Sequence, residues 1–344
     1  MDSAAAQSQT ADISPAQVEQ LCADFRRDYD AIAAEVGRVI VGQRDVVQEV
    51  LVTLLADGHA LLEGVPGLAK TLLIRTLSDA LHVEFSRIQF TPDLMPSDIT
   101  GTNIIEEDDH GRKSYKFIAG PVFASIILAD EINRATPKTQ SAMLEAMQER
   151  SVTIYGERRA LPEPFIVLAT QNPLEQEGTY PLPEAQLDRF MLKILLGFPH
   201  EDELMEIMER TTTATIVKAN RVLTGSRLLE MKQLVRRVAA APHVARYAVR
   251  LCTASHPDNV RAPESVKRYV RYGASPRGVQ ALILGGKVLA LLDGRFNLAF
   301  DDIRALAPAA LRHRVILNFE AEAEGRSADS IIKDIIAAIP ASAD

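Results

Sequence analysis

The sequence has no tryptophan, few aromatic residues and only two cysteines. Aromatic residues make up 5% of the 344 residues, which leaves little material for the stacking platforms that bind single-stranded nucleic acid. Cys22 and Cys252 lie far apart in apolar, helix-like segments. Two buried thiols are therefore the simpler expectation, and a disulfide or a metal site is the alternative. This cysteine usage is typical of a cytoplasmic protein.

Long apolar runs are also missing. No stretch of about 18 uncharged apolar residues occurs, so no membrane span is expected. The N-terminal stretch MDSAAAQSQTADIS lacks the basic start and apolar centre of a signal peptide, and we expect a short disordered tail there. The balance of 47% apolar and 24% charged residues is that of a globular protein, and 344 residues are enough for two or three domains.

The net charge of −8 hides an asymmetry along the chain. Residues 1–220 carry 19 Lys+Arg and 34 Asp+Glu, whereas residues 221–344 carry 19 and 12. An acidic first part and a basic second part indicate two domains. The opposite charges indicate either two independent solvated surfaces or two parts that meet, within one chain or between subunits.

The apolar pattern changes along the chain. Helical spacing after Ser14-Pro15 predicts a first helix that starts with a capping box. Short apolar runs then alternate with helix-like stretches such as 70–81 and 138–149, which predicts a parallel sheet with helices on both faces. The five runs are 59–64, 84–90, 124–130, 165–170 and 191–198. From about residue 200 only helical periodicity remains.

We therefore expect three parts: an N-terminal tail and helix over residues 1–35, an α/β core over 36–199 and an all-helical domain over 200–344. Two segments of the core fit neither pattern. Residues 91–123 have β-like arms around EDDHGR, and residues 150–164 have shorter arms around YGE. Each of these segments predicts a hairpin inserted into the core.

The run GVPGLAKT, residues 64–71, differs at one position from the phosphate-binding pattern G-x-x-x-x-G-K-[ST]. A predicted strand precedes it and a predicted helix follows, so backbone N–H groups and a helix N-terminus converge there. We expect Lys70 to meet the β- and γ-phosphates and Thr71 to meet Mg²⁺. Ala69 replaces the second glycine. We expect it to adopt a negative φ, because a positive φ would cost about 1–2 kcal/mol.

A second run, ASIILADEIN, ends in two carboxylates. Asp130 at the strand tip is suited to hold Mg²⁺, and Glu131 is suited to polarise an attacking water. Together with the Lys-Thr loop, this pair predicts a nucleoside-triphosphate hydrolase. The run FIVLATQNP adds Asn172, which could orient the water; an ordinary turn before Pro173 is the other explanation.

Arginine suits the charge that develops during phosphoryl transfer. Arg189 lies in PEAQLDRF, and Arg277 lies near the start of a predicted helix in YGASPRGVQ. Composition alone selects neither of them, because the chain has many arginines.

In this order, the motifs resemble the MoxR family of AAA+ ATPases, over nearly the whole chain from about residue 35. They are VGQ (41–43), LLEGVPGLAKT, IILADEINRA, ATQNP, YPLPEAQLDRF and GASPRG. The family tolerates alanine at the position of Ala69. The resemblance implies a P-loop core with a five-stranded parallel sheet, and a helical lid domain. It makes residues 91–123 the helix-2 insert and residues 150–164 the pre-sensor-1 hairpin.

The resemblance also implies roles for single residues of the core. Lys70 and Thr71 resemble the Walker A pair. Asp130 and Glu131 resemble the Walker B pair, and Asn172 resembles sensor 1.

Three arginines complete the comparison. Arg277 resembles sensor 2, Arg189 resembles an arginine finger that reaches into a neighbouring subunit's site, and Arg134 is a weaker match to a similar role. The residues implied to surround ATP and Mg²⁺ are Val41, Gly42, Gln43, Gly64, Val65, Pro66, Gly67, Leu68, Ala69, Lys70, Thr71, Leu72, Asp130 and Arg277.

We therefore expect a Mg²⁺-dependent cytoplasmic ATPase that forms a homo-oligomeric ring, expected as a hexamer, and whose lid moves against the core on hydrolysis. The resemblance implies a protein client, a separate partner with a von Willebrand factor A (VWA) domain, and chaperone-like maturation of metal- or cofactor-containing enzymes. One alternative is a nucleic-acid motor or loader, which the acidic core disfavours. The motor subunit of a metal chelatase is another, and no sequence feature excludes it.

Overall fold

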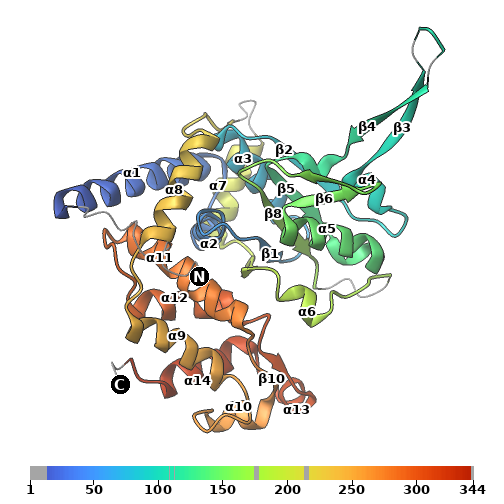
Figure 1. Ribbon diagram of the computed structural model, residues 1–344. Helices are drawn as coiled ribbons and strands as arrows, with labels where there is room; N and C mark the ends of the chain where they lie inside the picture. Colours follow the sequence, from blue (N-terminus) through green and yellow to red (C-terminus); the bar gives the residue numbers. More distant parts are fainter. Residues whose placement is uncertain (1–13, 108, 112, 174–177, 213–216, 342–344) are drawn as a thin grey trace, which may run out of the picture.

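The computed structural model describes residues 14–107, 109–111, 113–173, 178–212 and 217–341. A parallel five-stranded sheet lies at its centre, in the order β2-β5-β8-β1-β9 (Figure 1). Its strands are β1 (Ala60–Glu63), β2 (Phe85–Gln89), β5 (Ile126–Asp130), β8 (Ile166–Gln171) and β9 (Leu192–Leu195). Each strand overlaps one of the five apolar runs, so the predicted sheet is confirmed.

Alternate strand residues enter two separate apolar clusters, one on each face of the sheet. Leu62 and Leu128 belong to the cluster beneath the first three helices, whereas Leu61 and Ile127 belong to the cluster beneath the next two. These helices are α1 (Pro15–Val39), α2 (Arg44–Leu55), α3 (Lys70–Leu81), α4 (Pro96–Thr100) and α5 (Pro137–Glu149). Burial on both faces explains why the strands read as continuous apolar runs.

The first helix begins as the sequence predicts. Ser14 Oγ accepts from the Gln17 N–H, the Gln17 side chain accepts from the Ser14 N–H, and Pro15 occupies the first turn. This capping box satisfies N–H groups that a helix start leaves without partners.

Two antiparallel hairpins leave the α4 and α5 side of the sheet. β3 (Gly101–Glu107) pairs with β4 (Lys113–Ala119) and projects far from the body (Figure 1). β6 (Ser151–Ile154) pairs with β7 (Glu157–Ala160). Tyr155 and Gly156 between them both have positive φ, as a type I′ turn requires. Short helical turns complete this part: η1 (Pro121–Phe123), η2 (Ile132–Arg134) and α6 (Glu184–Leu187).

Beyond residue 200 the described chain is helical with one exception. Its helices are α7 (Glu201–Thr211), α8 (Gly225–Arg237), α9 (Pro242–Ala254), α10 (Glu264–Tyr269), α11 (Pro276–Leu292), α12 (Phe300–Leu311), α13 (Phe319–Ala323) and α14 (Ala328–Ala338). The exception is the antiparallel pair β10 (Val270–Tyr272) and β11 (Ile316–Leu317). The expectation of an all-helical domain missed this pair, because such short strands leave no period-2 signal.

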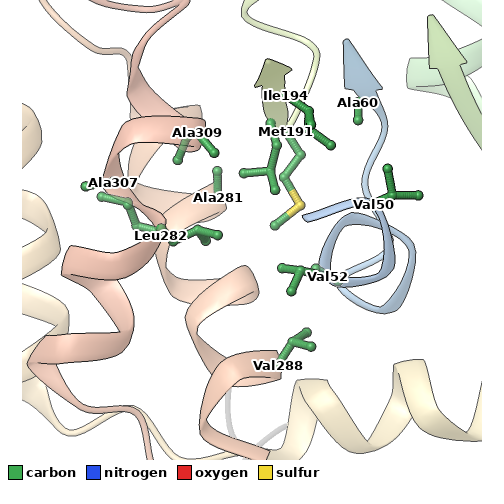
Figure 2. Close-up of a cluster of buried hydrophobic side chains, with 14 of the residues drawn as sticks. Val50, Val52, Ala60, Met191, Ile194, Ala281, Leu282, Val288, Ala307 and Ala309 are labelled. Atoms are coloured by element: carbon green, nitrogen blue, oxygen red, sulfur yellow. The ribbon is translucent and has the colours of Figure 1, made fainter. Parts of the chain in front are cut away.

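The helical domain shares a hydrophobic core with the sheet. Figure 2 shows Val52 of α2 and Met191, just before β9, beside Leu282 of α11 and Ala309 of α12. In α11, a Cβ atom at Gly285 would lie 3.1 Å from Met191 Cε and 3.3 Å from Val52 Cγ1 of the core. It would also lie 2.2 Å from Leu306 Cδ2 of α12, within the helical domain. Close packing therefore fixes the helical domain against α2 and β9.

Replacing Gly285 by alanine should lower the free energy of unfolding by about 1–3 kcal/mol, because the methyl group overpacks this core. Gly37 in α1 is the control, since nothing lies within 4 Å of a Cβ at that position. Gly37→Ala should raise the free energy of unfolding by about 0.5–1 kcal/mol through helix propensity. Urea unfolding measures both changes. A Gly285→Ala protein as stable as the parent would contradict the close packing.

Candidate active site

The loop between β1 and α3 forms the floor of the candidate site. Gly64 follows β1 directly and α3 begins at Lys70, so the first N–H groups of the helix face the loop. Lys70 Nζ donates a 2.7 Å hydrogen bond to the Gly64 carbonyl oxygen. Burial lowers the pKa of Lys70, while the nearby carboxylates of Asp130, Glu131 and Glu63 act in the opposite direction. The lysine thus lies in the field of the two predicted catalytic carboxylates.

Ala69 adopts a φ of 54°, in the left-handed region. The expectation of a negative φ was therefore wrong. Ala69 is the N-cap residue of α3 and makes no side-chain capping bond. A left-handed alanine costs about 1–2 kcal/mol, which is the cost that the glycine of the general pattern avoids. The preceding residue holds Ala69 in this conformation. Leu68 is buried, and the Leu68 carbonyl oxygen accepts a 3.3 Å hydrogen bond from Gln43 Nε2.

The two carboxylates follow β5 at the same edge of the sheet as the loop. Asp130 Oδ1 accepts a 2.6 Å hydrogen bond from Thr170 Oγ1 on β8. Glu131, which has a left-handed φ of 56°, donates its N–H to the same hydroxyl oxygen over 2.8 Å. One threonine therefore positions both acidic residues.

Two residues of β2 contact these carboxylates, and no sequence motif predicted either contact. Arg87 donates to Asp130 Oδ2 from Nη2 over 2.7 Å and from Nε over 3.0 Å. Gln89 Nε2 donates to Glu131 Oε2 over 2.8 Å. Arg87 and Gln89 are two residues apart in EFSRIQF, as residues on one face of a strand are. The sequence does not indicate that β2 lies beside β5. Arg134, also considered for a neighbour's site, donates to Glu131 Oε2 of its own chain over 2.9 Å.

The segment with Val41, Gly42 and Gln43 forms a side wall. Val41 is buried, and both Gly42 and Gln43 have positive φ. A Cβ atom on Gly42 would lie 2.1 Å from Glu203 Oε1 at the start of α7, so this segment lies against α7. We call residues 41–43, the loop 64–71 and the start of α7 the nucleotide cradle.

Asn172 and Leu72 lie where the strand and helix bounds predict. Asn172 directly follows β8, at the same sheet edge as Asp130, and is 5% exposed. Leu72 lies in the first turn of α3 and is 45% exposed.

Arg189 and Arg277 lie near each other but away from the loop. Arg189 Nη1 donates to the Leu144 carbonyl oxygen of α5 over 2.8 Å. Arg277 lies at the start of α11, and its Nη1 is 3.5 Å from Asp188 Oδ2. Both arginines line a cavity of about 310 Å³, together with the residues that lead into β1, Asp57–His59.

This arginine cavity lies at the amino edge of the sheet, whereas the loop lies at the carboxyl edge. The four residues of β1 alone separate the two edges by roughly 13 Å, at about 3.3 Å per residue. Arg189 and Arg277 are therefore brought together with each other, and not with Lys70 of their own chain.

Asp188 joins the two parts that carry these arginines. It accepts from Ser275 Oγ over 2.7 Å and from Arg314 Nε over 2.8 Å. Burial lowers the pKa of the Arg314 guanidinium, and the adjacent Asp188 carboxylate acts in the opposite direction. Asp188 thus links the turn that carries Arg189 to the start of α11 through Ser275, and buried Arg314 pairs with the same carboxylate.

Comparison with known proteins agrees with this geometry. Two family models match: the ATPase family associated with various cellular activities (AAA) over residues 59–192, and the AAA lid domain over residues 263–335. Chaperone MoxR1 of Mycobacterium tuberculosis is 43% identical over 322 residues, which are 94% of this chain and 84% of that protein. Protein MoxR of Methylorubrum extorquens is 32% identical over 340 residues, 93% and 96% of the two chains. The chain belongs to the MoxR family of AAA+ ATPases.

A solved structure agrees with the MoxR-family fold. The crystal structure of a Cytophaga hutchinsonii protein assigned as an ATPase matches with a TM-score of 0.87 at 41% identity, over 94% of this chain and 98% of that one. The predicted family, the P-loop α/β core and the helical lid are confirmed. Among the helices of the described residues, none has the length and apolar character to cross a bilayer.

The residues of this MoxR-family site fit Mg²⁺ and ATP. The N-terminus of α3 and Lys70 offer N–H groups and positive charge to phosphates. Mg²⁺ typically takes only one or two protein oxygens beside those of the phosphates, and Thr71 and Asp130 supply such oxygens. Among the described residues there is no group of three or more His, Cys, Asp or Glu that could hold a metal ion.

Ala69→Gly should raise the free energy of unfolding by about 1 kcal/mol, because the relief of left-handed strain exceeds the added chain entropy. Ala80→Gly, within α3 and in ordinary helical backbone, should lower it by about 1 kcal/mol. Thermal unfolding of the two variants compares them directly. A loss of stability in both would show that Ala69 is not strained.

Proposed function

We propose that this MoxR-family chain is a Mg²⁺-dependent ATP hydrolase whose complete active site forms between two copies in a ring. The observation that carries the proposal is the position of Arg189 and Arg277, together at the sheet edge opposite Lys70. Neither arginine serves the nucleotide of its own chain in this arrangement. A neighbouring copy whose cradle faces the arginine cavity would bring both of them to its γ-phosphate.

The cradle supplies the remaining groups. Lys70 would bind the β- and γ-phosphates, and Thr71 and Asp130 would hold Mg²⁺, which supplies charge neutralisation on the phosphates when bound. Glu131 accepts a proton from the attacking water, and Asn172 orients that water. The contacts of Glu131 with Gln89 and Arg134 hold its carboxylate at the end of β5 before nucleotide arrives.

The wider role proposed for the ring is chaperone-like remodelling or maturation of protein partners in the cytoplasm, with a hexamer as the expected assembly. The name of the relative Chaperone MoxR1 supports a protein client. A separate VWA-domain protein and metal- or cofactor-containing clients remain part of the proposal through family resemblance. The projecting hairpin β3–β4 is a candidate contact for such clients, because Ile105 and Tyr115 are paired on it and are 62% and 79% exposed.

A nucleic-acid motor is less well supported. The two arginines of the β6–β7 hairpin are engaged locally: Arg158 donates to Ser151 Oγ, and Arg159 lies over the Phe117 ring at 4.0 Å and pairs with Glu157. Because these contacts engage both arginines, the hairpin offers little positive charge to a nucleic-acid backbone. A metal-chelatase motor stays as the nearer alternative.

Glu131→Gln should keep ATP binding near the parent level and reduce turnover by about 10²–10⁴-fold, because the base is lost while the phosphate contacts stay. The control is Glu19→Gln on the exposed side of α1, which should leave turnover unchanged. Phosphate release and nucleotide binding measure the two effects. Turnover within about threefold of the parent would remove Glu131 from this role.

Mixing two inactive proteins tests the shared site. Lys70→Ala should lose ATP binding, and Arg189→Ala should bind ATP but lose roughly 10³–10⁵-fold in rate. After subunit exchange, some interfaces pair an intact cradle with an intact Arg189, so the mixture should recover ATPase activity. No recovery at any ratio, with exchange verified by a label on one protein, would contradict an arginine supplied by the neighbour.

A further inference from the structure

The helix α7 presents an apolar face that nothing in the described chain covers. It contains no buried residue. Leu204, Met205 and Met208, which are neighbours on a helix surface, are 40%, 52% and 47% exposed. Phe198, just before the helix, is 71% exposed. We call these four residues the α7 face. A contiguous exposed patch of this kind marks an interaction site more often than a solvated surface.

The helix that carries the α7 face is strongly acidic, and its start belongs to the nucleotide cradle. The helix carries Glu201, Asp202, Glu203, Glu206 and Glu209 against a single base, Arg210. That arginine is engaged, since it donates to the carbonyl oxygen of Arg38 over 2.7 Å. Glu203 touches Gly42 of the cradle, and Leu196 N–H donates to the Glu63 carbonyl oxygen beside the loop. The α7 face therefore lies on a helix whose first turn contacts the cradle.

A groove of about 870 Å³ lies between α9 and α11 in the lid. Its wall is mostly apolar, with Val249, Val279, Ile283 and Leu284 among the lining residues, and Arg236 and His256 also line it. Arg236, Gln280 and Leu284 line the arginine cavity as well. The groove is therefore continuous with the surface that presents Arg189 and Arg277.

The groove lies in a basic part of the molecule. Arg236 near the end of α8 lines it, and α9 carries Arg246 and Arg250 with no acidic residue. Other basic residues of α8 are paired elsewhere, Arg227 with Asp28 and Lys232 with Asp57. Arg246 and Arg250 lie on α9 with Val249, and Val249 is 43% exposed. An acidic, apolar helix is the complement of this apolar groove with basic surroundings.

We propose that the groove between α9 and α11 receives the α7 face of a neighbouring copy of this chain. The inference rests on the proposed function and deepens it. If the arginine cavity of one copy faces the cradle of the next, the groove beside the cavity must approach α7 beside the cradle. Two different patches then meet, so the contact is head-to-tail, the kind of contact from which a ring is built when its rotation closes. The methionines of α7 adapt readily to an apolar wall.

The test uses charges that repel in each single variant and attract in the mixture. Met208→Arg places a positive charge opposite the basic groove, and Val249→Glu places a negative charge opposite the acidic helix. Both new residues are good helix formers at exposed positions. Each variant alone should need at least about tenfold more protein to assemble in Mg²⁺ and ATP, as measured by sedimentation velocity. Val260→Glu, at a lid position that is 94% exposed and outside the groove, is the control and should assemble like the parent.

The equimolar mixture of Met208→Arg and Val249→Glu is the decisive sample. An alternating assembly would contain one unchanged contact and one contact in which the introduced charges attract, so the mixture should assemble near the parent concentration. Normal assembly of either single variant, or failure of the mixture to recover, overturns the proposed docking. The Lys70→Ala and Arg189→Ala mixture keeps both surfaces unchanged. Its recovery of activity alongside a failed docking test would leave the shared active site standing, and its silence would count against the shared site itself.

Discussion

The hydrophobic core that the lid shares with the sheet is the constraint on which the rest of the structure depends. Residues of α11 and α12 pack directly on α2 and β9, and Gly285 leaves room for Met191 and Val52. This packing holds the lid beside the amino edge of the sheet, where Arg277 meets Asp188. A lid fixed there cannot close over the phosphate loop of its own chain. The expected motion of the lid against the core would therefore have to disturb this packing.

The carboxyl edge of the sheet combines left-handed backbone with paired charges. Ala69 and Glu131 both have left-handed backbone at the two points where the chain turns toward the phosphates. Asp130 is bound on both oxygens, by Thr170 and by Arg87. A metal ion held at Asp130 as proposed would therefore compete with a guanidinium of the same chain.

Much of this could be read from the sequence, because the relevant signals are local. The five strands followed from apolar runs, α1 from its capping box, and the Lys70 and Asp130-Glu131 positions from motifs at strand ends. The φ of Ala69 could not be read, since one residue's backbone conformation is set by the packing of Leu68 and Gln43 around it. Arg87 and Gln89 required knowledge of strand order. The separation of Arg277 from Lys70 required the tertiary packing of the lid, which no local pattern contains.

The central claim is that one chain alone does not contain a complete active site. The most direct measurement is the ATPase rate per chain as a function of protein concentration, with the assembled fraction determined in the same samples by mass photometry. The account predicts that the rate per chain rises in proportion to the assembled fraction and that monomers are nearly inactive. Monomers that hydrolyse ATP at the same rate per chain as the assembly would contradict it.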